Sequence, residues 1–503
     1  MKRNTPNAIK KHFHNWLVRI ICALPKFQKG PIEEIQAAYE MFSREAHKSW
    51  QARQPPHGGN IRLESIRILE VFDIDHNLML TQGLRRLFPS CKRAAELADQ
   101  REQIAGAISN GSWHKIGVLT KSSSMRWKLF GDRQIVDTLP PCVEAIDVSY
   151  QSILPSLSAV SFDLHMSDAA TAKLRHAIDG IHDPGFVFNR WWPFHRQMGF
   201  SVEYGDMRMA QAYASAIDAL RMDSARWISR YLRGMYFNKN NIREGRIPAA
   251  YTFKVFGCPT DPESQKEWYS KNRRWLDAYR ATSMLPSFEI DNISIILPED
   301  WKGPCDAPCR IVVRDIPNDN NRRSPRHILD GLLGYQAVEG YITSCKRIIE
   351  GARMPVYSSM AHFKAQIRRK ALSRVFEVQH CRHLLGRTQM ELNSDSGGLA
   401  FCMMTLGGVY GEKKYYNDKS LAQVALDEIK QTLRNILEHA DYMEKALSET
   451  IYLQNIRAML RLGRDMKYLA VAGLVFSALQ IVVYRRELVE YFKTLLHYLE
   501  SIL

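Results

Sequence analysis

The sequence is poor in cysteine and lacks the short motifs that mark the common nucleotide-binding and metalloprotease sites. Its 503 residues include nine cysteines scattered along the chain, and such an odd, sparse set argues against a secreted disulfide scaffold. There is no Gly-x-x-x-x-Gly-Lys-Ser/Thr, Gly-x-Gly-x-x-Gly or His-Glu-x-x-His stretch. The scarcity of cysteine favours a reducing, cytoplasmic environment. The missing motifs weigh against an enzyme without excluding one.

Two short stretches look like sites but lack the partners that would complete them. Cys305 and Cys309 in CDAPC have neither a second cysteine pair nor spaced histidines beside them, so we expect two free thiols and predict no cofactor. DSGG at 395–398 looks like the nucleophile segment of serine proteases, but no histidine and aspartate motifs accompany it. We interpret it as a glycine-containing loop.

What the chain does contain is an ordinary globular composition with an excess of positive charge. Hydrophobic residues make up 45% and charged residues 24%, which disfavours a wholly disordered protein. The length exceeds the roughly 250–300 residues at which single cores stop growing, so two or three domains are expected. The net charge of +16 favours an anionic membrane surface or nucleic acid as a partner.

The first 30 residues contain seven bases and no acid. Apolar residues recur among them at helical spacing: Ile9, Phe13, Trp16, Leu17, Ile20 and Leu24. Arg19 interrupts the only apolar run, which argues against a secretory signal. We predict a basic amphipathic helix that either packs on its own domain or lies on an anionic membrane.

Strand-like and helix-like segments alternate after the turn-rich stretch at 54–60. Strands are predicted within 66–74, 113–120, 144–153, 156–166, 249–257, 292–298 and 309–316, and helices within 77–88 and 200–250. The fold class is therefore α+β: an N-terminal mixed α/β region followed by a long-helix, coiled-coil-like C-terminal domain that ends in a hydrophobic helix. The predicted divisions are an N-terminal segment at 1–60, a mixed α/β part at 61–317, a linker at 318–326, a helical stalk at 327–467 and a terminal part at 468–503.

The helical half carries a seam of apolar residues spaced by three and four: Leu426, Ile429, Leu433, Ile436, Ala440, Met443 and Leu447. No proline occurs from Lys419 to Leu503, so one helix can continue through much of that length. Helix pairing, within the chain or in a homo-oligomer, is the expected use of this seam.

An uncharged run of 17 residues, Tyr468 to Tyr484, follows the seam. As a helix it would be roughly 26 Å long, slightly less than a ~30 Å hydrocarbon core. Aromatic residues at both ends and bases beyond them are typical of a membrane segment, whereas a buried soluble helix remains the alternative. The predicted membrane residues are Tyr468, Val475, Phe476, Tyr484, Arg485 and Arg486.

A basic stretch at 361–390 is a second candidate contact for an anionic partner. It contains seven bases and one acid, a net charge of +6. The bases that we single out are Lys364, Arg368, Arg369, Lys370 and Arg374. Lipid headgroups or nucleic-acid phosphates would complement this charge, and an ordinary solvated helix face fits it equally.

FDIDHN at 72–77 is the most enzyme-like stretch, and it resembles the first motif of the haloacid dehalogenase superfamily. The resemblance implies a nucleophile at Asp73, an acid/base at Asp75 and a magnesium ion. It further implies a hydroxyl role for Thr120 and metal-binding roles for Asp132 and Asp137. The sequence departs from that pattern after Asp75 and in the short spacing beyond Thr120, and two aspartates at a strand end near a helix fit the same residues.

The leading hypothesis is a membrane-associated, cytoplasm-facing sensor or effector without a recognisable catalytic centre. One concrete version is a membrane-acting defence effector, by analogy alone. The alternatives are a phosphohydrolase that uses Asp73 and Asp75, and a soluble basic scaffold that binds nucleic acid or protein. Ligand, trigger and oligomeric state are not predicted.

Overall fold

The structure is a computed structural model that describes most of the chain. The described residues are 5–23, 31–73, 76–89, 113–121, 132–188, 200–244, 247–259, 261–279, 287–290, 293–296, 309–314, 330, 334, 336–351, 365–393 and 421–501. The chain divides into two compact units, one formed by 1–346 with 384–435 and the other by 347–383 with 436–503. The predicted domain bounds remain a prediction.

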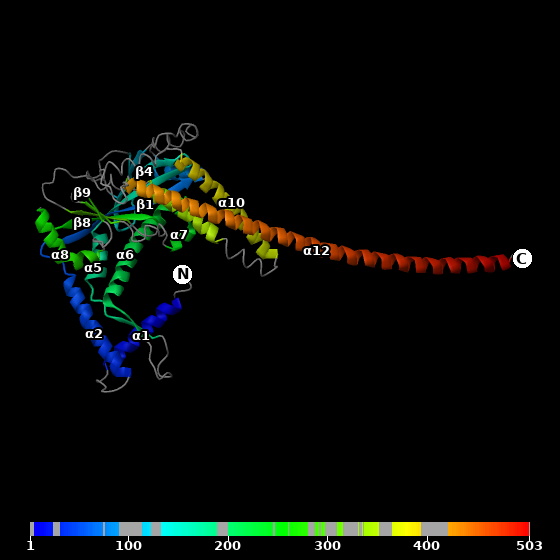
Figure 1. Ribbon diagram of the computed structural model, residues 1–503, viewed down its shortest axis with the longest axis horizontal. Helices are drawn as coiled ribbons and strands as arrows, with labels where there is room; N and C mark the ends of the chain where they lie inside the picture. The colour runs from blue at the N-terminus through cyan, green and yellow to red at the C-terminus, as the bar shows by residue number, and fades with distance from the viewer. Residues whose placement is uncertain are drawn as a thin grey trace. The chain divides into compact units, whose positions relative to one another are not determined.

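The first unit is built on a sheet whose described strands number nine, in the order β3-β2-β4-β5-β1-β8-β11-β10-β9. Figure 1 labels β1, β4, β8 and β9 of this sheet. The strands are β1 Asn60–Asp73, β2 Trp113–Thr120, β3 Asp132–Ile135, β4 Val143–Leu154, β5 Leu157–Met166, β8 Ala249–Phe256, β9 Ser287–Ile290, β10 Ile293–Ile296 and β11 Cys309–Arg314. Two further strands, β6 Gly185–Phe188 and β7 Phe200–Glu203, pair separately.

Antiparallel pairing dominates the middle of the sheet. The central strand β1 pairs with β5 on one side and β8 on the other, and β5 pairs in turn with β4, all antiparallel. Parallel pairing occurs between β2 and β3 and between β8 and β11. Because β1, β4 and β5 are almost wholly buried, these strands form the core of the unit.

Before residue 330, the described helices of the first unit are α1 Thr5–Ala23, α2 Pro31–Ala52, α3 Asn77–Leu87, α5 Asp168–Asp179, α6 Gly205–Ile228, α7 Lys239–Glu244 and α8 Pro262–Ala278. Of these, α5 and α6 pack on β1 and on each other. The β1 backbone is joined to α5 by the Leu63 N–H, which donates to Thr171 Oγ1 at 3.2 Å. Asp261 caps α8 by accepting from the Ser264 N–H at 2.9 Å.

The mixed α/β architecture and the long C-terminal helix that the sequence predicts are confirmed. The strands predicted around the short Leu-Pro turn at 154–155 are β4 and β5, and the long helix predicted within 200–250 is α6. The proline-free C-terminal stretch forms one helix, α12 Leu421–Glu500, of 80 residues. It continues through Gly463 and Gly473, the two positions where intrinsic helix propensity is weakest.

The predicted seam lies on α12, and its described middle part is buried within one chain. Ile429, Leu433, Ile436, Ala440 and Met443 are all buried. In the second unit, Arg382 of α10 Ala365–Asn393 forms ion pairs with Asp441 and Glu444 of α12. Coiled-coil pairing is not confirmed, because the seam's described side chains are already covered inside the chain.

Candidate functional site

The terminal part of α12 is apolar and wholly exposed. Residues Asn455–Glu500 form a helical stretch of 46 residues that is long and apolar enough to cross a membrane, and none of its most apolar window is buried. Length and composition alone support this candidate span. A helix of this length measures about 69 Å, more than twice a hydrocarbon core, so only part of it can lie across a bilayer.

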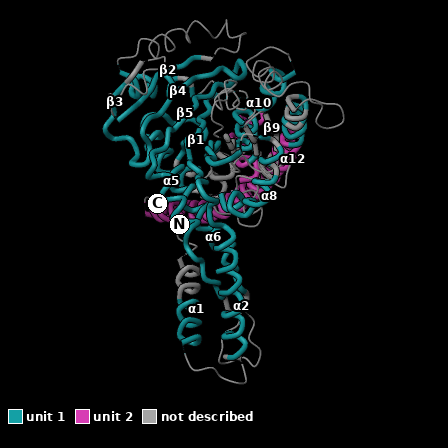
Figure 2. The backbone as a smooth tube through the Cα atoms, turned by 90° about the vertical axis from the view of Figure 1, so that its left-hand side faces the viewer, with its two compact units in different colours: residues 1–346, 384–435 teal, residues 347–383, 436–503 magenta. Residues whose placement is uncertain are grey.

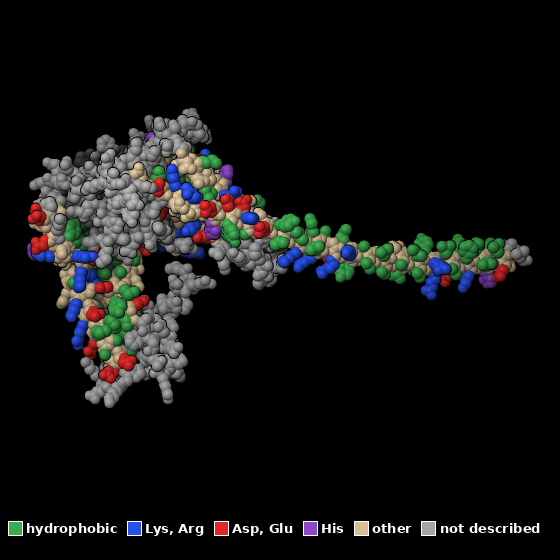
Figure 3. All heavy atoms as spheres, viewed as in Figure 1, with side chains coloured by type: hydrophobic (Ala, Val, Ile, Leu, Met, Phe, Trp, Pro, Cys, Tyr) green, Lys and Arg blue, Asp and Glu red, His purple; other side chains and the backbone are tan. Residues whose placement is uncertain are grey.

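The predicted membrane residues lie along this exposed stretch. Tyr468, Val475, Phe476 and Tyr484 are all exposed, as are Arg485 and Arg486 beyond them. Figure 3 shows hydrophobic side chains along the visible face of the distal α12, with Lys and Arg gathered at two places along it. The apolar run is therefore bounded at both ends by bases, as sequence reasoning expected.

Bases before the run also share a helix face. Arg457, Arg461 and Arg464 follow one another at spacings of four and three, so their side chains leave α12 on the same side. Lys467 comes directly before the uncharged run. This end of the candidate span thus presents a concentrated positive charge, and Asp465 is the one acid within it.

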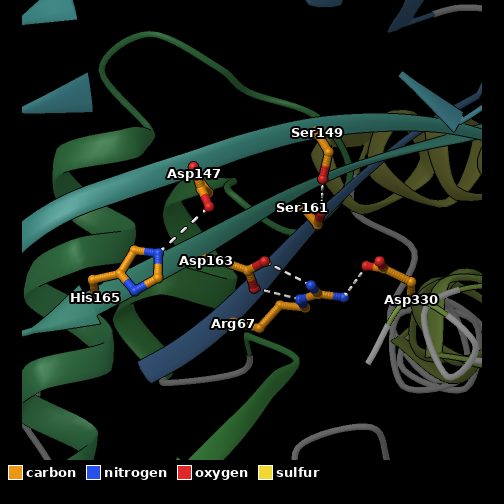
Figure 4. Close-up of polar contacts among 7 residues, drawn as sticks. All are labelled: Arg67, Asp147, Ser149, Ser161, Asp163, His165 and Asp330. Atoms are coloured by element: carbon orange, nitrogen blue, oxygen red, sulfur yellow. Dashed lines mark hydrogen bonds and ion pairs between the residues drawn. The ribbon is translucent and has the colours of Figure 1, made fainter. Parts of the chain in front are cut away.

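A second candidate is a polar row on one face of the sheet (Figure 4). Directly opposed residues of neighbouring strands point to the same face, and Asp163 of β5 lies opposite Arg67 of β1 and Asp147 of β4. Two residues along each strand, and therefore on the same face, Ser161 lies opposite Ser149, and their hydroxyl oxygens are 2.8 Å apart. The polar row, defined by these five residues with Lys115, His165 and Asp330, is largely buried.

Arg67 is the centre of the polar row. Its guanidinium donates to both carboxylate oxygens of Asp163, with Nη2 to Oδ2 at 2.6 Å, and its Nη1 donates to Asp330 at 2.7 Å. The side chain of Arg67 is 1% exposed. Two carboxylates beside a fully buried guanidinium raise its pKa against the opposing effect of burial, so Arg67 stays charged.

Asp147 has its own basic partners. Lys115 Nζ lies 3.3 Å from one of its carboxylate oxygens, and His165 Nε2 lies 3.5 Å from the other. The two aspartates that face each other across β4 and β5 are thus each held by a different base. This arrangement is what a buried structural ion-pair network requires, because each buried charge needs an opposite charge nearby.

Glu70 is a buried carboxylate that binds backbone instead of a base. It accepts N–H hydrogen bonds of 2.7–3.0 Å from Val71, Gly234, Tyr236 and Phe237. Burial raises the pKa of Glu70 to about 7, although each of the four donors lowers it. The side chain therefore fixes the segment after α6 against β1.

The haloacid dehalogenase resemblance finds little geometric support. Asp73 ends β1, is buried and accepts from the backbone N–H of His76 at 3.0 Å, with His76 Nδ1 2.6 Å from the same oxygen. Asp75 lies outside the described residues. Asp73 pairs with Leu157 at the start of β5, whereas Thr120 pairs with Ala145, which is opposite His165 near the end of β5.

Eight residues of β5 therefore separate the levels of Asp73 and Thr120, about 26 Å along the strand. The strands β1, β5, β4 and β2 are neighbours in that order, and each pairs with the next in the antiparallel sense. The C-terminal ends of β1 and β2 therefore point in opposite directions along the strands. The structure thus does not bring Thr120 to Asp73. Asp132 begins β3, and Asp137 follows it on the surface.

The basic stretch lies mainly on α10. Arg368, Arg369, Lys370 and Arg374 are in its first half, and Lys364 lies outside the described residues. Two other bases that enter the +6 count are used within the chain: Arg382 pairs with α12, and Arg387 pairs with Glu391 at 3.0 Å. The charge available to an outside polyanion is thus smaller than the sequence implies.

The remaining sequence candidates give no assembled centre. DSGG at 395–398 and Cys305 lie outside the described residues, and Cys309 begins β11. Among the residues that the structure describes, no group of three or more His, Cys, Asp or Glu side chains is arranged to hold a metal ion. The chain matches no family model, no curated protein and no solved structure.

Proposed function

We propose that the chain is a membrane-associated, cytoplasm-facing sensor or effector that is anchored through the terminal part of α12. The observation that carries the proposal is the complete exposure of an apolar stretch long enough to cross a bilayer. Exposed apolar patches larger than a few hundred Å² are rare on soluble monomers and mark membrane or protein contacts. The uncharged run at 468–484 with its aromatic and basic ends favours a membrane as the cover.

The charge around the run supports the cytoplasmic orientation of the preceding chain. Four bases lie in 455–467, and three lie in 485–500. Lys and Arg are enriched on the cytoplasmic side of membrane segments, and the anionic cytoplasmic leaflet attracts them by about 1 kcal/mol for each base near the surface. In this proposal the sheet-bearing unit receives a ligand or partner, and a defence effector is one form that such a protein takes.

The test compares two arginine substitutions at equally exposed positions of α12. Val475 is 53% exposed inside the uncharged run, and Leu453 is 56% exposed before it. An arginine at the centre of a membrane segment costs about 2.5–3.5 kcal/mol of insertion free energy. We expect carbonate to release the full-length Val475→Arg protein from the membrane fraction, while Leu453→Arg stays with the membrane and resists carbonate extraction.

Two results would contradict the proposal. One is wild-type protein that fractionates as soluble, which would favour the soluble scaffold. The other is equal resistance of both arginine variants to carbonate extraction. A phosphohydrolase is not proposed, since the structure adds no observation in its favour, and a homo-oligomer through the helical half remains a prediction.

A further inference from the structure

The outward face of α1 is a second unassigned surface, far in sequence from α12. Phe13, Trp16 and Ile20 lie on this face at spacings of three and four and are 45%, 56% and 40% exposed. The rings of Phe13 and Trp16 contact each other, with centroids 5.9 Å apart. A soluble helix normally turns such residues toward its own core.

The fold does not need this face, because α1 packs through its other side. Val18 and Ile21 are buried in a cluster with Ile35 of α2 and Phe186 of β6. The predicted apolar stripe is only partly used for packing: Phe13, Trp16 and Ile20 are exposed, whereas Val18 and Ile21, which lie outside the predicted stripe, are buried. In Figure 2, α1 and α2 stand side by side, apart from the strands of the large sheet.

Polar contacts fix which side of α1 faces out. Asn15 Oδ1 accepts from the Phe186 N–H at 3.0 Å, and Gln36 Nε2 donates to the Ile21 carbonyl at 2.9 Å. Arg19, at the edge of the outward face, forms a longer ion pair with Asp183 at 3.5 Å. These contacts tie the helix to β6 and α2, so the aromatic face is held outward.

Charge identifies the partner that fits this face. The sequence of α1 includes Lys10, Lys11 and Arg19 and contains no Asp or Glu. A basic helix with Trp and Phe on its apolar face is the composition of helices that lie in the interface of an anionic bilayer. The indole ring is suited to that layer, because its apolar body and its N–H prefer different sides of it.

We propose that the α1 face formed by Phe13, Trp16 and Ile20, together with the bases Lys10, Lys11 and Arg19 of the same helix, is a peripheral binding surface for anionic lipid headgroups. It deepens the proposed function and rests on it, since it presupposes that the chain works at a membrane. It differs in kind from the α12 anchor: α1 lies on the surface and depends on charge, whereas α12 inserts.

The test uses the full-length Val475→Arg protein, in which the α12 anchor is disabled at an exposed position. Its sedimentation is measured with vesicles of phosphatidylcholine alone and of an equimolar mixture with phosphatidylserine. We expect binding to the mixed vesicles only, with loss of binding in high salt. Adding Trp16→Gln should weaken this binding by about tenfold, because a large apolar ring no longer enters the interface.

Two further variants serve as controls. Leu78→Gln, which removes an equally exposed apolar side chain from α3, should leave vesicle binding unchanged. Trp16→Phe should retain most of the binding, and Lys10→Gln should weaken binding to the mixed vesicles. Far-UV circular dichroism should show that each variant keeps its helical content, so that a loss of binding reports the surface and not the fold.

The inference is overturned if the Val475→Arg protein does not bind mixed vesicles, or if Trp16→Gln binds them as well as its parent does. Equal binding to both vesicle types would also overturn it, because the partner would then not be an anionic surface. Failure of the α12 proposal has a different signature, namely wild-type protein that carbonate removes from membranes.

Discussion

Replacing Arg67 with methionine should destabilise the sheet-bearing unit by about 3–5 kcal/mol, the usual cost of removing one partner of a buried ion pair. The cost arises at Asp163, whose side chain is only 8% exposed and loses both of its bonds to the guanidinium. Asp330 contributes less, because it is 20% exposed and makes a single contact. Water can partly replace that contact.

A double substitution separates the ion pair from ordinary packing. Arg67→Met with Asp163→Leu removes both charges and leaves apolar side chains that can pack in their place. Buried ion pairs are often replaced by apolar residues at little or no cost, so the double variant should recover most of the lost stability. The expected coupling between the two sites is therefore about 3 kcal/mol, far above the additivity error for independent sites.

Urea unfolding followed by tryptophan fluorescence measures the relevant part of the chain. All ten tryptophans lie between residues 16 and 301, so the signal reports the region that contains the sheet and not α12. Arg44→Met is the matched control, since Arg44 is exposed and pairs only loosely with Glu40, at 3.7 Å. Its effect should stay within about 0.5 kcal/mol.

The reasoning is refuted if Arg67→Met behaves like the surface control. It also fails if the double variant is as unstable as the single one, because the damage would then come from lost packing around the arginine stem and not from the stranded carboxylate.

Three other predictions follow from single contacts. Burial raises the pKa of Glu70 from 4.5 to about 7, so the folded state holds this proton more tightly than the unfolded chain. Unfolding free energy should therefore fall as pH rises from about 4.5 through 7, and Glu70→Gln should flatten this dependence in urea titrations at several pH values. Gly340→Ala should lower the melting temperature, because the new Cβ would lie 1.3 Å from the Tyr236 hydroxyl and overpacking costs about 1–3 kcal/mol. We expect no magnesium-dependent phosphatase activity on a panel of phosphate esters, either in the wild type or in Asp73→Asn. Robust wild-type turnover that is lost in Asp73→Asn would contradict this expectation.

Local pattern was enough to predict most elements of the sheet. The strands at 113–120 and 249–256 and the hairpin around 154–157 have the length, the composition and the flanking turn residues that strands require. Their order was not predictable, because the pairing of β1 with both β5 and β8 joins segments about 100 and 190 residues apart. That information lies in side-chain packing and not in local periodicity.

The polar row was not predicted from the sequence, because the residue pattern of its strands is typical of a solvent-exposed sheet face. Asp147, Ser149 and Gln151 alternate with apolar residues along β4, and Ser161 and Asp163 do the same along β5. Such alternation normally predicts a solvated sheet face. Here the face is buried, since bases from two neighbouring strands neutralise the aspartates. The one clue in the sequence was Arg67, which lies within the mainly apolar stretch from Ile66 to Phe72.

For the terminal helix, the sequence made the apolar run obvious, but it did not show whether that run is a core helix or a membrane helix. An apolar run fits a core helix and a membrane helix equally, because burial depends on what the rest of the chain supplies. Along α12 the chain covers Ile429 to Met443 and covers nothing from Asn455 onward. The same helix therefore contains a part whose apolar side chains are buried within the chain and a part whose apolar side chains are exposed. Bases and tyrosines bound that second part, so the bilayer that we propose as its cover would account for both its apolar middle and its charged ends.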